Sequence, residues 1–596
     1  MATAEVPGNL TKQDPLGVLD RVDELLEATY WSADLGNLHD VLSETVYILL
    51  SRQTREIVYQ RVFADLRSRF PTWRMLARAR VSTVESVLRP AGFGKQRAEQ
   101  LHKLIRLVDA KNQELRAGPY APNSGDLTLE FLRDWPAVDA ERFLESLPGI
   151  GPKSVRCVMS YSLGHRRFAV DTHVHRIMRR LGLAAESPGK PDHNAIEAIV
   201  PRKFRVRLHI NLVHHGRALC TETAPRCNEC PLVTFCAFGR AQVANRRQGH
   251  TVVDLFGGAG AMGLGFRQAG FDLLAAVEID RHAAQTYRLN HPGVPVLECG
   301  VQQVTGAVLQ AWIPGMRPPA AVIAGPPCQG YSAAGSRTVG DERNLLFRHV
   351  GRIAKDVGAR AVLIENVPGV RRVNGVSYTD RITQSLRDAG YETWDEPALL
   401  KACDFGVPQN RRRLFFLGVA PWLELPPVPK PSHQVPGSDH PTLPTGPTLA
   451  ERLEDLPVLG SGDGAERLVL EDGRVILNSS VMKHSEAVVR KISAIDVGGG
   501  PISYRRLDLD LARTLVAGHR ALPVHPTQHR TITVREAARV QGFPDDYFFC
   551  GPRACQPLQV ANAVPPALAK AIAEQLLQAL SSVPAPDNSI AEEGAA

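Results

Sequence analysis

Residues 147–154 read LPGIGPKS, which joins a Gly-x-Gly turn to a lysine, Lys153. When such a turn opens a helix, the backbone N–H groups of Gly149 and Gly151 can approach a phosphate closely. The lysine can contact the same phosphate, or it can act as an amine nucleophile if its surroundings partly deprotonate it. Farther along, Asp171 in VDTH begins a predicted helix, where a carboxylate can cap the helix or stabilise developing positive charge. Taken singly, these residues indicate phosphate binding and helix capping at least as much as catalysis.

Four cysteines lie within one short stretch, with spacings x6, x2 and x5: Cys220, Cys227, Cys230 and Cys236. Thiolates clustered this closely indicate a shared metal centre. Zinc sites usually present two short Cys-x2-4-Cys pairs separated by a longer arm, whereas one compact loop with a single close pair suits an iron–sulfur cubane. The spacing therefore favours a [4Fe–4S] cluster in a loop at 220–236, with zinc as the alternative.

The elements that position these residues differ between the two halves of the chain. From about residue 38 to 220, apolar residues recur at helical spacing and strand-like alternation is scarce, which predicts an all-α fold. After a predicted linker at 237–249, the apolar runs TVVDLF, LLAAVEID, AAVIAGPP and AVLIENV alternate with helical segments. This pattern predicts a parallel sheet with helices on both faces. The first run leads into DLFGGAGAMGLGF, a glycine loop of the nucleotide-binding type that is weak evidence alone.

Charge and composition narrow the classes of function. The length of 596 residues suggests about four compact units. Residues 151–250 hold 17 Lys and Arg against 6 Asp and Glu, which favours a polyanionic partner over a merely solvated basic face. No run of 18 apolar residues suggests a membrane span, and the first residues lack the pattern of an export signal. We therefore expect a soluble, cytoplasmic protein with reduced cysteines, a flexible segment at 1–20 and a disordered tail at 582–596.

The first half resembles the endonuclease III family of helix-hairpin-helix DNA glycosylases over residues 21–236. The resemblance rests on five motifs in order: LLSRQT, GFGKQRA, LPGIGPKS, FAVDTHVHRIMRRLG and the four-cysteine loop. It implies that Lys153 is the nucleophile, that Asp171 stabilises positive charge on the sugar, and that the enzyme is a bifunctional glycosylase and lyase. Gln53 is a candidate to fill the space of an extruded base, and Gly149 and Gly151 are candidates to contact DNA. The string GIGPKSVRCV is also similar to plant 5-methylcytosine glycosylases of the DEMETER type.

The second half resembles the DNA cytosine-5 methyltransferases over about residues 250–575, with a domain expected at 250–581. GPPCQGYSAAG, DERNLLF, IENVPG, FGVPQNRRRLFF, TVREAARVQGFPD and QVANAVPP follow in the order of that family. The resemblance implies that Cys328 adds to C6 of cytosine, that Glu365 holds or protonates N3, and that Arg411 and Arg413 grip the base oxygen and a nearby phosphate. The Pro-rich region at about 418–529 is expected to read the target sequence, and Thr514 belongs to its recurrent Thr-Leu pair.

The same resemblance implies S-adenosylmethionine as the cofactor. Its expected binding residues are Asp254, Phe256, Gly258, Gly260, Glu278, Pro327 and Asn562. Three positions depart from the family pattern, because Ala261 replaces a glycine, Gly300 replaces the aspartate that reads the adenine, and Ala561 replaces a glycine. Loss of the aspartate puts the affinity for the cofactor in question, whereas the catalytic set is intact.

These resemblances predict one polypeptide with two active sites that both act on double-stranded DNA, with no membrane and no obligatory protein partner. An enzyme that makes 5-methylcytosine favours a glycosylase that removes thymine from T:G mismatches, since deamination of that product gives the mismatch. The alternatives are excision of 5-methylcytosine itself or of oxidised pyrimidines, a modification–restriction system, and a first half that only clamps DNA for the methyltransferase. The intact pair of Lys153 and Asp171 argues against the clamp.

Overall fold

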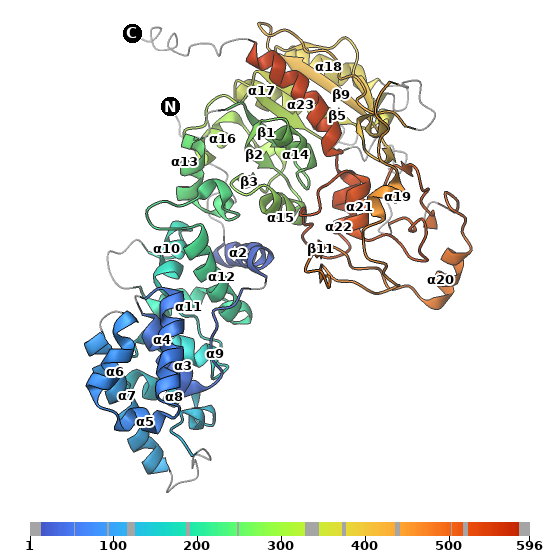
Figure 1. The fold of residues 1–596 in the computed structure, drawn as a ribbon. Coiled ribbons are helices and arrows are strands. Elements are labelled where there is room, and N and C mark those ends of the chain that lie inside the picture. Colours follow the sequence, from blue (N-terminus) through green and yellow to red (C-terminus); the bar gives the residue numbers. More distant parts are fainter. Residues whose placement is uncertain are drawn as a thin grey trace, which may run out of the picture. The chain divides into compact units, whose positions relative to one another are not determined.

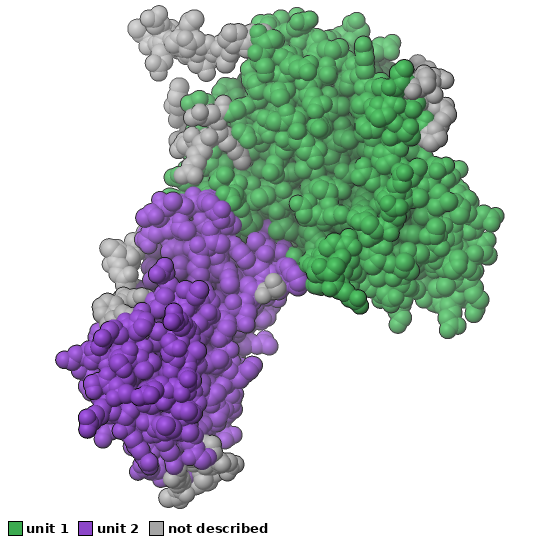
Figure 2. Space-filling model, in the orientation of Figure 1, with its two compact units in different colours: residues 1–13, 227–596 green, residues 14–226 purple. Residues whose placement is uncertain are grey.

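The computed structural model describes residues 14–31, 33–52, 54–91, 94–115, 125–185, 191–246, 249–327, 345–371, 377–435, 442–501, 504–516 and 522–582. The chain divides into two compact units, shown in Figure 1 and Figure 2. Residues 14–226 form one, which we call the helical unit. Residues 1–13 and 227–596 form the other, which we call the sheet unit.

Within the residues that the structure describes, the helical unit contains helices and no strands, which confirms the all-α prediction. Its core is made by apolar residues at helical spacing, such as Leu42, Val46 and Leu49, which are all essentially inaccessible to solvent. The elements are α2 (Pro15–Tyr30), α3 (Val41–Ser51), α4 (Glu56–Arg69), α5 (Trp73–Arg78), α6 (Val81–Leu88), η1 (Arg89–Ala91), α7 (Gly94–Leu115), η2 (Glu130–Arg133), α8 (Ala137–Ser146), α9 (Pro152–Tyr161), α10 (Thr172–Arg180), α11 (His193–Ile199), η3 (Arg202–Phe204) and α12 (Arg205–Ala218).

The sheet unit is built on one mixed sheet with the strand order β3-β2-β1-β4-β5-β9-β6, in which β7 also pairs with β9. The strands of this sheet are β1 (Thr251–Leu255), β2 (Asp272–Val277), β3 (Val296–Leu297), β4 (Ala321–Ala324), β5 (Ala361–Asn366), β6 (Glu392–Thr393), β7 (Ala398–Lys401) and β9 (Arg412–Val419). The strands β1 to β5 run parallel to one another, as predicted. The strand β9 runs antiparallel to β5, β6 and β7, so the sheet is mixed, which the sequence analysis did not predict.

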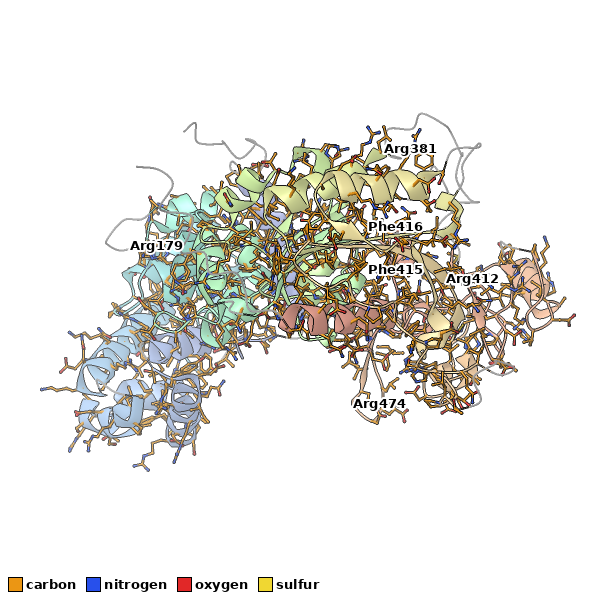
Figure 3. The ribbon with its side chains drawn as sticks, turned by 90° about the horizontal axis from the view of Figure 1, so that it is seen from above. Arg179, Arg381, Arg412, Phe415, Phe416 and Arg474 are labelled. Atoms are coloured by element: carbon orange, nitrogen blue, oxygen red, sulfur yellow. The ribbon has the colours of Figure 1, made fainter. Side chains whose placement is uncertain are left out.

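Helices cover both faces of this sheet, and two apolar cores result. On one side lie α16 (Gly306–Trp312), α17 (Phe347–Asp356) and α18 (Tyr378–Asp388), and on the other α14 (Ala261–Gln268), α15 (Arg281–Asn290) and α23 (Pro566–Ser581). Because side chains alternate along a strand, the neighbours Phe415 and Phe416 of β9 enter opposite cores, as Figure 3 shows. The strands are therefore apolar on both faces, which explains their continuous apolar sequence runs.

Short elements follow β9 in the region expected to read the DNA sequence. They are α19 (Leu449–Leu453), β10 (Arg467–Val469), β11 (Val475–Leu477), α20 (Glu486–Ser493) and β12 (Ala512–Arg513), after which α21 (Val534–Val540) and α22 (Gln556–Asn562) return to the main body. The strand β12 pairs with β8 (Gln409–Asn410), which directly precedes β9. A further core joins this region to the glycine loop through Ala259 and Ala261.

Three predicted boundaries differ from the structure. The helix α2 begins at Pro15 and buries Val18 and Leu19, so the flexible segment predicted at 1–20 extends too far. Residues 237–246 of the predicted linker form α13 (Ala237–Arg246). This helix is held within the sheet unit because Arg240 donates to the carbonyls of Trp312 at 3.1 Å and Thr234 at 2.6 Å.

The division between the units falls between residues 226 and 227, before the expected boundary at 236. It therefore separates Cys220 from the other three cysteines of the loop. The short 3-10 turns η4 and η5 follow this division, at Cys227–Glu229 and Val233–Phe235. Among the described residues, the other 3-10 turns of the sheet unit are η6 (Val301–Gln303), η8 (Pro368–Arg371) and η9 (Ala402–Phe405). No helix in the described part of the chain is long and apolar enough to cross a membrane.

Candidate functional sites on the two units

Lys153 lies in the first turn of α9, directly after the turn that the sequence singled out. Gly149 has a φ of +83°, and a Cβ there would lie 2.8 Å from Leu49 Cδ1, so the turn requires glycine at this position. Gly151 caps the helix with a φ of −106°, and a Cβ there would meet nothing within 4 Å. The start of α9 therefore presents open backbone next to Lys153, as a phosphate-binding helix start needs.

Asp171 is the N-cap of α10 and accepts the Val174 N–H at 2.8 Å. Burial raises the pKa of its carboxyl, but His209, the Val174 N–H and Lys153 together lower it by more than burial raises it. The net pKa of Asp171 therefore lies below the usual value. His209 is itself buried, which lowers its pKa to about 4, and its Nδ1 donates to the Ala169 carbonyl at 2.8 Å. Lys153 and His173 are the other side chains near Asp171 that lower the pKa of its carboxyl.

A second buried carboxylate, that of Glu44, lies within electrostatic range of Lys153, and the sequence analysis missed it. Glu44 of α3 is completely buried, and its carboxylate accepts the Leu38 N–H at 2.7 Å and the Asn37 Nδ2 amide at 2.5 Å. Burial raises its pKa, while Leu38, Asn37 and Lys153 oppose the rise. The signal in the sequence was available, because Glu44 is the sole charged residue of α3.

Two predicted site residues lie outside the described residues. Gln53 falls in the gap between residues 52 and 54, and Cys328 falls in the segment 328–344. Pro327 is the last described residue before Cys328 and is half-buried at the end of the loop that leaves β4.

The four cysteines of the loop are divided between the two units. In the helical unit, Cys220 Sγ accepts a hydrogen bond from Arg180 at 3.1 Å. In the sheet unit, Cys236 Sγ accepts the Gly239 N–H at 3.2 Å. N–H donors of this kind suit thiolates that ligate a cluster, because they stabilise charge on the sulfur. In the described part of the chain, no group of three or more His, Cys, Asp or Glu side chains is arranged to hold a metal ion.

On the sheet unit, Glu365 and Arg413 form a buried ion pair between neighbouring strands. The Arg413 Nε lies 2.8 Å from Glu365 Oε1, and each side chain is about one tenth exposed. Glu365 belongs to β5 and Arg413 to β9, and the antiparallel pairing of these strands brings the two side chains together. Burial raises the pKa of Glu365, while the charges of Arg413 and Arg411 oppose the rise. The pair can hold a polar heterocycle that presents both donors and acceptors.

Arg411 has a different position from Arg413. It is completely buried, and its guanidinium donates to the carbonyls of Ala561 at 2.8 Å and Leu515 at 3.2 Å. Thr514 donates through its hydroxyl to the Asn410 carbonyl at 2.9 Å. In this structure Arg411 therefore connects the Thr-Leu pair and the end of α22 to the β8–β9 segment. Its expected grip on the base oxygen or a phosphate stays a prediction.

The glycine loop after β1 turns sharply at three residues. Phe256, Gly258 and Gly260 have φ values of +56°, +54° and +90°, and Gly260 caps α14. A Cβ on Gly260 would collide with the His291 ring, so this position requires glycine for space as well as for conformation. Phe256 is the uncommon case of an aromatic residue with a positive φ, and such strain is typical of binding sites.

Glu278 follows β2 and reaches over this loop. Its carboxylate accepts the N–H groups of Gly258 and Asp280, each at 2.7 Å, and burial raises its pKa. Ile279, the next residue, is 74% exposed, although it is a large apolar side chain. The sequence analysis did not single it out. A Cβ on Gly300 would lie 3.9 Å from Ile279 Cδ1, so the position that lacks the family's aspartate adjoins this exposed side chain.

The remaining two predicted cofactor residues differ in exposure. Asp254 is completely buried beneath the loop, where its carboxylate accepts the Tyr287 hydroxyl at 3.1 Å. Burial and the nearby Glu278 raise its pKa to about 7, against the Tyr287 hydrogen bond. Asp254 therefore stabilises the base of the glycine loop. Asn562 is exposed at the end of α22.

Comparison with family models assigns each half of the chain separately. The model of the C-5 cytosine-specific DNA methylases matches residues 250–578, which is more than half of the chain. The model of the HhH-GPD superfamily of base excision DNA repair proteins matches residues 46–202. Both matches contain the side chains described above, since Glu365 and Arg413 lie in the first and Lys153 and Asp171 lie in the second.

Two type II methyltransferases agree with the assignment of the second half. The type II methyltransferase M1.HphI of Haemophilus parahaemolyticus is 36% identical over 345 residues, which cover 55% of this chain and 87% of that protein. M.XorII of Xanthomonas oryzae is 34% identical over 367 residues, which cover 56% of this chain and 85% of that protein. Among solved structures, a trapped covalent intermediate of endonuclease III with DNA is 22% identical, with a TM-score of 0.33, and covers 39% of this chain and 99% of that one.

Proposed function

Because the chain belongs to the C-5 cytosine-specific DNA methylases and carries an HhH-GPD base excision repair domain in its first half, we propose one polypeptide with two active sites on duplex DNA. The sheet unit transfers a methyl group to C5 of cytosine. The helical unit removes a base and then cleaves the strand as a lyase. Both reactions require the target base to leave the double helix, because neither C5 nor the sugar carbon is otherwise accessible.

The buried pair of Glu365 and Arg413 carries the methyltransferase proposal. C5 of cytosine is a weak nucleophile, and addition of the Cys328 thiolate to C6 makes the ring electron-rich. Glu365 holds or protonates N3 as the ring takes up the electron pair, and a raised carboxyl pKa favours this proton donation. Arg413 keeps the Glu365 carboxylate in position. When C5 later loses its proton, the electron pair returns to the ring and the thiolate leaves.

The residues around the glycine loop fit S-adenosylmethionine, which supplies an electrophilic methyl group when bound. Glu278 presents a carboxylate suited to ribose hydroxyls at the end of β2. The exposed Ile279 offers an apolar surface to a flat ring, and Phe256 can stack near a cation. Asp254 supports the loop, and Pro327 and Asn562 stay proposed contacts. The apolar contact with Ile279 is then available to adenine although Gly300 offers no carboxylate.

Methyl transfer tests the first half of the proposal. Tritiated S-adenosylmethionine should label cytosine C5 in duplex DNA, and Cys328→Ser should abolish the transfer. Glu365→Gln should lower the rate by about 100-fold or more, since general acid catalysis contributes that much. Glu392→Gln, at an exposed position of β6, serves as the matched control. Normal transfer by Cys328→Ser would contradict the mechanism.

Lys153 and Asp171 carry the glycosylase proposal, because the fold brings the amine and a carboxylate with a lowered pKa within electrostatic range. Asp171 stabilises the positive charge that develops on the sugar as the base departs. The Lys153 amine bonds to C1′ and forms a Schiff base, and the strand 3′ to the site is then released by elimination. A clamp that only binds DNA needs neither group.

We propose thymine in T:G mismatches as the base that is removed. Deamination of 5-methylcytosine gives thymine opposite guanine, so the methyltransferase creates a supply of this substrate. The free energy needed to extrude a mispaired base is also lower, by about a few kcal/mol, and this difference contributes selectivity. The second candidate is 5-methylcytosine itself, which the similarity of GIGPKSVRCV to the plant enzymes favours.

Single-turnover excision distinguishes these substrates. Protein carrying Cys328→Ser, which cannot methylate the substrate during the assay, is mixed with duplexes that contain C, 5-methylcytosine, T:G or an oxidised pyrimidine. The mismatched thymine should leave fastest, and Lys153→Gln should lose the borohydride-trapped adduct. Faster release of 5-methylcytosine from a fully paired duplex would replace our choice with the second candidate.

We also propose that the four cysteines at 220–236 hold a [4Fe–4S] cluster with a structural and DNA-positioning role. The proposal rests on the x6, x2, x5 spacing and on the N–H donors to Cys220 and Cys236. Protein purified anaerobically from iron-replete cells should be brown and contain about four iron and four sulfide per chain. Stoichiometric zinc without iron would contradict it.

A further inference from the structure

The part of the cysteine loop that belongs to the sheet unit, residues 227–236, is bonded to elements next to the glycine loop. Thr234 of this part is 2% exposed. Its hydroxyl accepts hydrogen bonds from the Arg288 Nε at 3.2 Å and from the Val296 N–H at 3.1 Å. Arg288 belongs to α15, and Val296 begins β3. One buried hydroxyl therefore connects the cysteine loop to a helix and to a strand of the sheet unit.

The turn between α15 and β3 approaches the same loop too closely for a side chain. The Gly293 N–H donates to the Cys230 carbonyl at 3.1 Å, and a Cβ on Gly293 would lie 2.1 Å from the Asn228 carbonyl oxygen. The Arg288 guanidinium carbon lies 4.9 Å from the centre of the Phe235 ring, and this arginine is completely buried. Main-chain and side-chain contacts therefore give residues 227–236 a fixed place beside α15 and β3.

The helix α15 also holds the glycine loop, through residues next to Arg288. Tyr287, the preceding residue, donates its hydroxyl to the buried Asp254 carboxylate at 3.1 Å. His291, directly after the helix, donates from Nε2 to the Gly260 carbonyl at 2.9 Å. Both acceptors lie in the strand and loop expected to bind the cofactor. The same helix therefore contacts the cysteine loop through one residue and the glycine loop through its neighbours.

The strand β3 makes a second connection to the cofactor residues. It pairs with the end of β2, where the Leu297 carbonyl accepts the Glu278 N–H at 3.0 Å. Glu278 is the carboxylate proposed for the ribose hydroxyls. Val296, the residue before Leu297, is the one that donates to Thr234. A displacement of the cysteine loop would therefore be transmitted to the Glu278 side of the site as well as to the glycine loop.

We propose that Thr234 is a positioning residue for S-adenosylmethionine, and that the cysteine loop is a structural part of the methyltransferase site. This inference rests on the proposed binding of S-adenosylmethionine at the glycine loop. The resemblance to endonuclease III gives the cysteine loop to the other activity, so one loop serves both proposed reactions. The connection does not depend on the metal that the cysteines bind, because the Thr234 hydroxyl and the Cys230 main chain make its contacts.

Equilibrium dialysis of tritiated S-adenosylmethionine against the full chain without DNA tests this inference. Thr234→Val keeps a side chain of similar size but removes the acceptor of the Arg288 and Val296 N–H groups. We expect the dissociation constant to rise by about fivefold or more, the size typical of coupling between two sites. The KM for S-adenosylmethionine in methyl transfer should rise in parallel. The kcat at saturating cofactor should stay within about twofold, because no reacting group is changed. Thr234→Ser keeps the hydroxyl and should restore the affinity of the wild type.

Tyr391→Phe is the matched control for the loss of a buried hydrogen bond. The Tyr391 hydroxyl donates to the Ala359 carbonyl at 2.9 Å, and this residue directly precedes β6, at the opposite edge of the sheet from β3. Like Thr234→Val, this variant should lower the thermal midpoint, but its affinity for S-adenosylmethionine should equal that of the wild type. An unchanged dissociation constant in Thr234→Val, or an equal rise in both variants, would overturn the inference.

A second measurement uses the wild type and therefore does not depend on whether a variant folds. Coupling between two sites is reciprocal, so bound S-adenosylmethionine should slow hydrogen exchange of the amides at 230–236 by about fivefold or more. Mass spectrometry of the peptide that contains these residues measures the exchange. Exchange in this peptide that is the same with and without S-adenosylmethionine would also overturn the inference. Absence of binding to the wild type would instead overturn the proposed cofactor site.

Discussion

Asp171 serves the fold and the proposed chemistry with the same carboxylate. It caps α10 through the Val174 N–H, and it faces Lys153 across the site. Asparagine caps a helix about as well as aspartate but has no charge. We therefore expect Asp171→Asn to keep the thermal midpoint and DNA affinity while base removal falls by about 100-fold or more, since a charge stabiliser contributes that much.

Asp171→Ala separates the two roles of this residue. It removes the cap as well as the charge, so it should lower the free energy of unfolding by about 1 kcal/mol in addition to stopping base removal. Excision assays and thermal unfolding on both variants measure this. If Asp171→Asn excises the base at the rate of the wild type, Asp171 acts only as a cap.

At the scale of single residues, the sequence predicted those side chains that sit in motifs. Lys153 and Asp171 lie at expected helix starts and Glu365 lies near the end of an expected strand, because short-range signals position them. No strand was predicted at Arg413, although its motif was recognised. Glu44 was missed because the packing of α3 against α9, which brings it within electrostatic range of Lys153, cannot be read from spacing. A lone charge in an apolar helix was the only local sign of it.

At the scale of elements, the turn before α9 offers a matched pair of glycines. Gly149 has a positive φ and no space for a Cβ, whereas Gly151 has a negative φ and open space. Gly149→Ala should therefore lower the free energy of unfolding of the helical unit by about 1–3 kcal/mol, because the backbone is strained and Leu49 must move.

Gly151→Ala is the control for this turn. We expect its stability to stay within about 0.5 kcal/mol of the wild type, while its affinity for DNA falls, since a methyl group then stands between the backbone N–H groups and a phosphate. Thermal unfolding and DNA titration check both variants. Equal destabilisation by the two substitutions would show that the turn is not shaped as described.

The buried Asp254, next to the glycine loop of the sheet unit, predicts how the stability of this unit changes with pH. The buried Asp254 has a pKa of about 7, above its ordinary value of 3.8, so the folded state binds more protons than the unfolded state between these values. The contribution of Asp254 to the free energy of unfolding is therefore most favourable below pH 4 and is lost as the pH rises through 7. Between low and high pH, this contribution to the free energy of unfolding changes by on the order of 4 kcal/mol.

Asp254→Asn should remove this dependence, because asparagine still accepts the Tyr287 hydroxyl and does not ionise. Relative to the wild type, it should become progressively more stable from pH 5 to pH 8 in urea unfolding without cofactor. Asp272→Asn, at an exposed position of β2, should show no such trend. A stability difference that is constant with pH would contradict a protonated Asp254.

The elements themselves were predicted unevenly from the sequence. The helices of the first half were predicted from helical period, and the parallel strands of the second from continuous apolar runs between helical segments. The reversal at β9 was not, because only residues 402–411 separate it from β7, and parallel strands need a crossover of a dozen or more residues. The helix α13 was taken for a linker because its ten residues are weakly amphipathic, and its place depends on Arg240 and the buried Val243.

At the scale of the whole molecule, the two proposed activities share one chain, and this sharing can be tested without dividing it. Lys153→Gln should lose the lyase and keep methyl transfer, and Cys328→Ser should do the reverse. An equimolar mixture of the two variants then contains both activities on separate molecules, whereas the wild type has both on one. The comparison isolates the effect of the covalent connection.

We expect the wild type to exceed the mixture on DNA that carries a T:G mismatch close to an unmethylated target site. After one unit binds, the tether holds the other near the same DNA at an effective concentration of about millimolar, which exceeds the concentration of free enzyme in the assay. With excess competitor DNA added after binding, the yield of molecules that are both methylated and excised should be at least tenfold higher for the wild type. An equal yield from the mixture would mean that the two active sites work independently, and that the fusion brings no gain to repair at the site of methylation.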